Sequence, residues 1–127
     1  MGVDYKTAMN VASGFGGGMY MGSVCGAVSG AFMALGLKYG GDPNAPMAKV
    51  VKEFSDRFKA RHRFVNCSEL IGVDLSNVDL SNPEAVKALK EKMIKEKNPN
   101  ALCGSFVRDA AEIVDAMMKE ARPGAIG

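Results

Sequence analysis

The chain has 127 residues, a length typical of a single domain that buries a sizeable core. It is 47% hydrophobic and 24% charged, which is a globular composition and excludes a disordered chain. The net charge of +2 is too small to indicate a nucleic-acid partner. We therefore expect one domain over residues 1–127 and no binding to nucleic acid.

A short helix is predicted over residues 3–13, with Asp4 near its start and Gly14 placed to end it. Its apolar residues recur at helical spacing: Tyr5, Ala8, Met9 and Ala12. Residues 14–18 are too rich in glycine to hold a helix, because each interior glycine costs about 1 kcal/mol relative to alanine. A glycine-rich loop is therefore expected between the first helix and the next.

No charged side chain occurs from Gly14 to Leu37. Ser23 is placed to cap a helix that runs over about residues 23–38, and Gly40 is placed to end it. Because this helix is apolar all round, it is either the buried centre of the fold or a membrane span. The glycines before it would leave unsatisfied backbone groups in lipid, so we expect a central core helix and no membrane span.

Amphipathic segments follow. Apolar residues from Met47 recur at i, i+3, i+4, i+7 and i+11, which predicts a helix with one buried face. Its basic end, residues 57–63, is either a phosphate or partner patch or, as we favour, a set of cations that suits a helix C-terminus. Asn66 and Glu69 are typical of a capped helix start, and Gly72 ends that short helix.

The next helix is predicted to open at Ser81 and Pro83, with a solvated lysine face, and a last helix follows Asn100. No segment shows the alternation of a strand. The sequence therefore predicts an all-α fold, a compact bundle of about five helices around the central one, with a further short helix at Cys67.

The chain has three cysteines, which cannot all pair with one another, and none lies in a Cys-x-x-Cys spacing. A disulfide framework and covalent c-type haem are therefore not expected. The N-terminus lacks the apolar run of a secretory signal, so the expected location is the reducing cytoplasm.

Each cysteine falls in the first turn of a predicted helix: Cys25, Cys67 and Cys103. The positive end of a helix favours a thiolate, which is the form that binds a metal or attacks a disulfide. Three buried structural cysteines are the alternative. From spacing alone, both interpretations stay open.

Three segments carry a resemblance to a known family: Cys25-Gly26-Ala27-Val28-Ser29-Gly30, Cys67-Ser68-Glu69-Leu70-Ile71-Gly72 and Cys103-Gly104-Ser105-Phe106-Val107-Arg108-Asp109-Ala110. The first resembles the Cys-Gly-Ala-x-x-Gly signature of the C_GCAxxG_C_C family, redox-active bacterial and archaeal proteins with four characteristic cysteines. The family is similar to the non-haem part of split-Soret cytochromes, which are helical and dimeric and are associated with an iron-sulfur cluster. The family's first cysteine precedes the glycine-rich loop, and this chain starts too late to contain it.

The resemblance implies that the three sulfurs converge on an iron-sulfur cluster or another thiophilic metal such as zinc, in a homodimer that serves an unknown redox partner protein. A [2Fe-2S] cluster normally takes four cysteines. The fourth ligand is then His62, an exogenous group, or a cysteine of another chain. Four glycines are expected to let backbone approach Cys25 and any cluster closely: Gly16, Gly17, Gly18 and Gly26.

Two further functions remain open. One is a thiol-disulfide or peroxide-handling enzyme that uses Cys25 or Cys103 as an activated thiolate. The other is a helical interaction domain with inert cysteines. No pattern of a hydrolytic enzyme occurs, and the redox potential and physiological process are not encoded in any motif.

Overall fold

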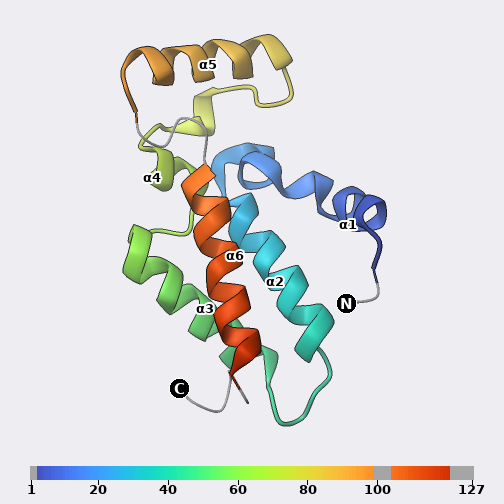
Figure 1. Ribbon diagram of the computed structural model, residues 1–127. Coiled ribbons are helices and arrows are strands. Elements are labelled where there is room, and N and C mark those ends of the chain that lie inside the picture. The colour runs from blue at the N-terminus through green and yellow to red at the C-terminus, as the bar shows by residue number, and fades with distance from the viewer. Residues whose placement is uncertain (1–2, 99–103, 121–127) are drawn as a thin grey trace.

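The computed structural model describes residues 3–98 and 104–120. Within these residues the fold contains six α-helices and no strand, which confirms the all-α prediction (Figure 1). The helices are α1 (Tyr5–Ala12), α2 (Gly26–Tyr39), α3 (Met47–His62), α4 (Cys67–Ile71), α5 (Pro83–Lys95) and α6 (Gly104–Lys119).

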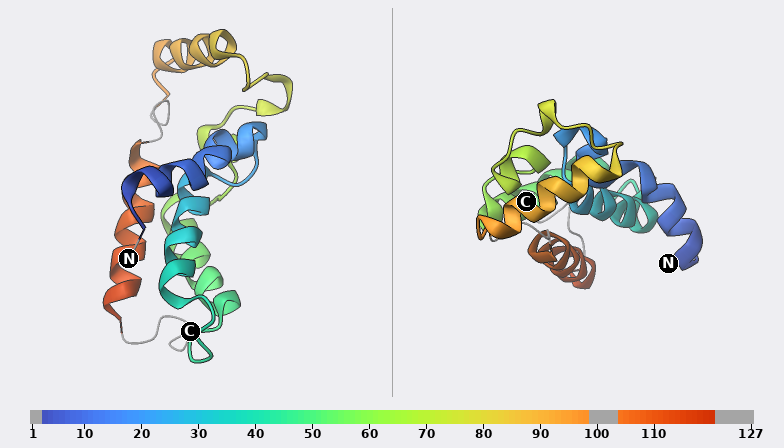
Figure 2. Two further views of the ribbon diagram at one scale, coloured as in Figure 1. Left: turned by 90° about the vertical axis from the view of Figure 1, so that its right-hand side faces the viewer. Right: turned by 90° about the horizontal axis from the view of Figure 1, so that it is seen from above.

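Three helices, α2, α3 and α6, pack together as the main bundle (Figures 1 and 2). Fully or almost fully buried residues from all three fill the space between them: Val28, Leu35, Val50, Phe54, Phe58, Phe106, Ile113 and Met117. The Phe54 ring meets Phe32 edge to face, with centroids 5.5 Å apart, and stacks on Phe58 at 5.9 Å. The apolar spacing from Met47 thus predicted the buried face of α3 correctly.

The central helix begins later than the sequence predicts. α2 starts at Gly26, and Cys25, not Ser23, is its N-cap residue. The later start results from a contact between distant segments. Ser23 and Cys25 form backbone hydrogen bonds with residues 65–67, so this stretch is extended and does not join the helix. At the other end the Gly40 N–H donates to the Gly36 carbonyl over 2.8 Å, so Gly40 ends α2 as predicted.

α1 stands apart from the bundle (Figure 2). The Asp4 carboxylate accepts the Thr7 N–H over 2.7 Å and caps the helix as expected. The helix ends at Ala12 with Ser13 as its C-cap, so Gly14 does not end it; a single 3-10 turn over Ser13–Phe15 follows. No residue of α1 is buried.

α5 lies at one end of the molecule, beyond α4 (Figure 1). The Asn82 side chain accepts the Glu84 N–H over 3.0 Å, so Asn82 caps the helix and Ser81 does not. The lysines of α5 are exposed as predicted, Met93 is buried and the neighbouring Ile94 is exposed. The Asn98 side chain donates to the Ile71 carbonyl over 2.9 Å and ties the end of α5 to α4.

α2, which corresponds to the apolar segment long enough in sequence to suggest a membrane span, has 14 residues. Across the described ranges, no helix is both long enough and apolar enough to cross a bilayer. The long uncharged stretch is instead divided between a loop and this helix.

Candidate metal and redox site

Cys25 lies at the N-terminal end of α2. Its N–H donates to the Val65 carbonyl over 2.7 Å, and its own carbonyl accepts the Ser29 N–H of the first helical turn. The side chain is buried and makes no capping hydrogen bond. The first N–H groups of a helix have no partner within it, so this end stabilises a negatively charged ligand such as a metal-bound thiolate.

Cys67 is the first residue of α4. Its N–H donates to the Ser23 carbonyl over 2.6 Å, and its side chain is also buried. Asn66 is the N-cap residue and its side-chain amide donates to Glu69 over 3.1 Å, while Gly72 ends the helix in a left-handed conformation. The predicted start and end of this short helix are both confirmed.

The two cysteines are held near each other by one pairing. Val24 and Asn66 form an isolated antiparallel bridge, and Cys25 and Cys67 each follow a member of it. In a regular antiparallel pair, residues in these two positions lie on the same face as diagonal neighbours, roughly 7–8 Å apart. A disulfide needs Cα atoms within about 7 Å, whereas two thiolates on one zinc each lie about 2.3 Å from the metal. The pairing therefore suits two ligands of one metal centre.

Cys103 lies outside the described residues, and α6 begins at the next residue, Gly104. α2 and α6 run side by side with their N-terminal ends at the same end of the bundle, where α4 also lies (Figure 1). Gly26 and Val107, from the first turns of α2 and α6, line one groove. For residues 3–98 and 104–120, no three His, Cys, Asp or Glu side chains form a metal-binding group. Convergence of all three sulfurs therefore remains a prediction.

The glycine-rich loop turns back through a left-handed segment just before Cys25. Gly17 and Gly18 have φ of 58° and 63°, and Met19 and Tyr20 share this conformation with φ of 59° and 56°. The Gly18 carbonyl accepts the Ser23 N–H over 2.9 Å, and a Cβ at Gly18 would collide with Ser23 backbone. The loop closes onto the segment that carries Cys25.

The absence of a side chain at Gly26 lets this loop pack closely against the start of α2. A Cβ at Gly26 would lie 3.0 Å from the Phe15 carbonyl oxygen and 3.4 Å from the Gly16 Cα. Gly22, which the sequence did not single out, has φ of 74°, and a Cβ there would collide with Ser68 and Leu75. These glycines permit close backbone packing around the two cysteines, and direct contact of Gly16, Gly17, Gly18 and Gly26 with a cofactor stays a prediction.

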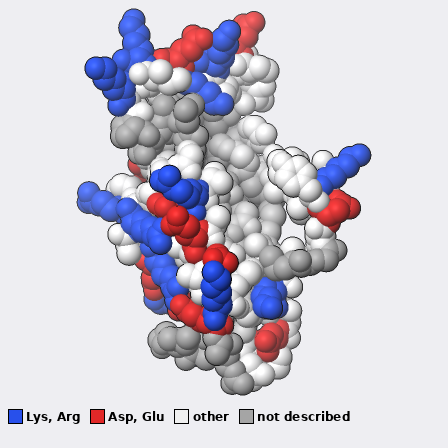
Figure 3. Space-filling model, viewed as in Figure 1, with Lys and Arg blue, Asp and Glu red and all other residues white. Residues whose placement is uncertain are grey.

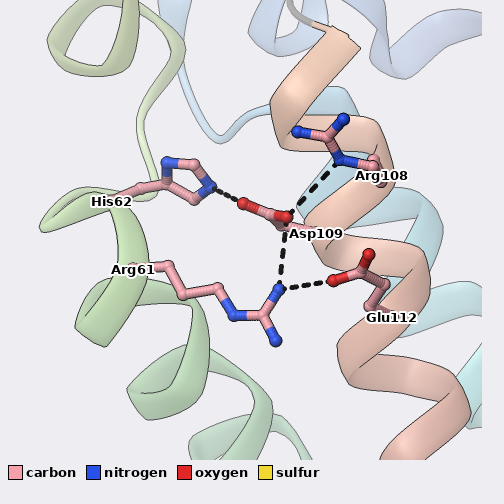
Figure 4. A network of polar contacts seen from close by, with 5 residues as sticks. All are labelled: Arg61, His62, Arg108, Asp109 and Glu112. Carbon is pink, nitrogen blue, oxygen red and sulfur yellow. Dashed lines mark hydrogen bonds and ion pairs between the residues drawn. The ribbon is translucent and has the colours of Figure 1, made fainter.

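His62 is the last residue of α3 and points at α6. Its Nε2 lies 2.7 Å from Asp109 Oδ2, and its ring is flanked by Phe58 and Phe106 with centroids 4.8 and 4.9 Å away. Because a carboxylate only accepts hydrogen bonds, a neutral His62 ring carries its proton on Nε2. The other ring nitrogen points away from Asp109 (Figure 4). A histidine that binds a metal commonly donates its second N–H to a carboxylate in this way.

The basic end of α3 is used in ion pairs. Arg57 contacts Glu120 at 2.8 Å and Glu53 at 3.0 Å, and the hydrogen bond to Glu120 raises the pKa of the Arg57 guanidinium above its usual value. Arg61 contacts Glu112 at 2.9 Å and Asp109 at 3.2 Å (Figure 4). These two arginines link α3 to α6, which supports the structural interpretation of the basic segment over a phosphate site.

One family matches the chain, and its description reads "Putative redox-active protein (C_GCAxxG_C_C)", with residues 1–117 aligned. The motif in that description reads Gly-Cys-Ala-x-x-Gly, whereas this chain reads Cys25-Gly26-Ala27-x-x-Gly30, with the first two residues exchanged. No curated protein and no solved structure matches the chain. Because the match covers most of its length, the chain belongs to the C_GCAxxG_C_C family of redox-active proteins.

Proposed function

We propose that Cys25, Cys67 and Cys103 hold an iron-sulfur cluster or another thiophilic metal, and that the protein transfers electrons. The single observation that carries the proposal is the Val24–Asn66 pairing, because the residues that follow its two members are the buried Cys25 and Cys67, at the end of the bundle where α6 begins. Thiolates are soft ligands that select iron-sulfur clusters, zinc or copper(I). Of these groups, a bound iron-sulfur cluster would supply the electron-carrying chemistry.

The residues around the two sulfurs fit such a group. Both thiols are shielded from water, and Cys25 lies at the positive end of a helix of 14 residues. The fourth ligand is proposed to be an exogenous group, a cysteine of another chain, or His62 through Nδ1 with Asp109 orienting the ring. In the described structure His62 forms no metal-binding group with Cys25 and Cys67, so ligation by His62 would require the two segments to move together.

A thiol-disulfide activity is the second candidate, because the same pairing places Cys25 and Cys67 near each other, and a small approach that brings their Cα atoms within about 7 Å would allow the bond. Oxidation would join two cysteine sulfurs, release two protons and pass two electrons to a disulfide or peroxide substrate. Such a couple loses two thiols reversibly on oxidation, whereas thiols bound to a metal are recovered when a chelator removes it.

We also propose that the protein works in the reducing cytoplasm as a homodimer with a separate redox partner protein. Exposed apolar side chains on α1 support self-association, among them Tyr5, Met9 and Val11. The reducing compartment would keep the cysteines available for a metal.

The test is anaerobic purification and reconstitution, followed by visible absorption and analysis of iron, sulfide and zinc. Cys25→Ser, Cys67→Ser and Cys103→Ser are each expected to lower the metal content. Ala116→Ser is the matched control, because it adds a hydroxyl on the exposed side of α6, outside the groove, and removes no sulfur. A metal-free wild type, or metal content that none of the cysteine substitutions lowers, would show that the cysteines hold no metal.

A further inference from the structure

α1 exposes its apolar residues. Tyr5, Met9 and Val11 are 80%, 54% and 63% exposed, and no residue of the helix is buried. Isolated helices shorter than about 12–15 residues are only marginally stable in water, and most helices in proteins depend on packing of an apolar face. α1 has 8 residues. Among the described residues the bundle leaves most of this apolar face uncovered, although Met9 lies at the edge of a groove of its own chain, so the face needs further cover.

A groove of about 650 Å³ runs beside α1, between α2 and α6. Its lining is apolar and mostly small, and includes Met9, Gly30, Ala34, Val107, Ala111 and Val114. No atom of the described residues beyond its own helix lies within 4 Å of a Cβ built at Gly30. A glycine inside a helix costs about 1 kcal/mol, and nothing described in the chain uses the space it leaves. Close approach by a segment from outside would use it.

The chain itself supplies both complementary surfaces, an apolar helix and an apolar groove, as a two-fold symmetric interface requires. The charges on the two surfaces also suit a second copy of this chain. Lys6 is the one charged residue within α1, and Asp115 is the one charged residue among the described residues that line the groove. These two surfaces are therefore nearly uncharged and opposite in sign. Figure 3 shows the same division: charged side chains gather over α3, α5 and one side of α6, and none lies over the start of α2 between α6 and α1.

The exposed apolar side chains of α1 and the apolar lining of the groove are the surfaces that a second copy would cover. A standard interface covers roughly 800 Å² on each partner.

We propose that this face is a self-association surface, in which α1 of each chain lies in the groove between α2 and α6 of a second copy. The inference rests on the proposed homodimer and assigns its interface. It does not depend on metal binding, because Tyr5, Gly30 and Val107 lie outside the proposed ligand set.

Sedimentation equilibrium of the full chain tests the assignment. The wild type is expected to be a dimer at micromolar concentration, and Gly30→Leu and Val107→Glu are each expected to raise the dissociation constant roughly tenfold or more. Gly36→Leu is the matched control, since it lies in the same helix with open space at its Cβ but outside the groove; Ile94→Glu is a second control on α5. Circular dichroism reports whether each variant keeps its helix content.

Two results overturn the inference. A wild type that stays monomeric overturns both the interface and the homodimer. A dimeric wild type whose dissociation constant changes equally in Gly30→Leu and Gly36→Leu overturns the interface alone. Unchanged metal content in folded Gly30→Leu is expected in either case, which separates this proposal from the metal site.

Discussion

Val24 pairs with Asn66 as an antiparallel bridge, and this pair holds the segment before α2 against the segment before α4. The residues that follow each member are Cys25 and Cys67, so one backbone contact positions both thiols. The bridge also explains why α2 starts at Gly26, since the preceding residues are extended to make the pair. The proximity of Cys25 and Cys67 thus comes from a non-local contact that helix patterns do not encode.

Gly22 is predicted to be required for this arrangement. Gly22 and Gly72 have nearly the same φ, 74° and 73°, but only at Gly22 would a Cβ collide with other residues. Gly22→Ala and Gly72→Ala should each lower the free energy of unfolding by about 1–2 kcal/mol, because alanine is strained in the left-handed conformation. Gly22→Ala should lose roughly 1–3 kcal/mol more through overpacking against Ser68 and Leu75. Urea unfolding of the pair measures the difference, and equal stabilities would contradict the close packing.

Asp109 is predicted to stabilise the contact between α3 and α6. Its carboxylate contacts the side chains of His62 and Arg61, and it is largely buried, with 17% of its side chain exposed. Asp109→Ala leaves both partners without their acceptor and should cost about 1–3 kcal/mol. Asp56→Ala is the control on α3, because the pair of Asp56 with Lys52 is exposed and should contribute less than about 0.5 kcal/mol. A loss in Asp109→Ala no larger than in the control would refute this role.

Gly26 should resist substitution where another glycine of α2 does not. Gly26→Ala places a Cβ 3.0 Å from the Phe15 carbonyl and should destabilise the protein by about 1–2 kcal/mol. Gly36→Ala meets no described atom within 4 Å and should stabilise the helix by about 0.5–1 kcal/mol. Thermal unfolding of the two variants gives opposite shifts of Tm if the loop packs on α2 as described. Shifts of the same sign would indicate that it does not.

Tyr39 is expected to make stability fall at high pH. Burial, and then the nearby Glu120 carboxylate, raise the pKa of the Tyr39 phenol above its ordinary value of 10.0. Below pH 10.0 the phenol is protonated in both states; above it the unfolded chain ionises first, so stability falls as pH rises toward the raised pKa. Tyr39→Phe should reduce this slope, measured by urea unfolding between neutral and alkaline pH.

The control for that slope is Tyr20→Phe, since Tyr20 is exposed and lies outside the proposed self-association surface. It should leave the alkaline slope of the wild type unchanged. Equal slopes in all three proteins would show that Tyr39 does not ionise differently in the folded state.

Local patterns predicted the helices well where a continuous apolar face was present. α3 and the described part of α6 follow their spacing, and the cap at Asp4 and the ends at Gly40 and Gly72 depend on nearby residues only. The start of α2, the need for glycine at position 22 and the pairing of His62 with Asp109 all depend on residues far away in the chain. Spacing alone therefore left the role of the cysteines open, and it did not predict the backbone contacts that hold the segments of Cys25 and Cys67 against each other.

X-ray absorption at the zinc edge of the zinc-loaded protein tests the central claim most directly, because it counts the atoms bound to the metal. We expect three sulfur ligands from this chain at about 2.3 Å from zinc. If His62 is the fourth ligand, a nitrogen at about 2.0–2.1 Å is also expected, and His62→Gln should remove it. Cys25→Ser, Cys67→Ser and Cys103→Ser should each remove one sulfur. A first shell of oxygen and nitrogen alone, unchanged by these substitutions, would contradict a metal centre built on the three cysteines.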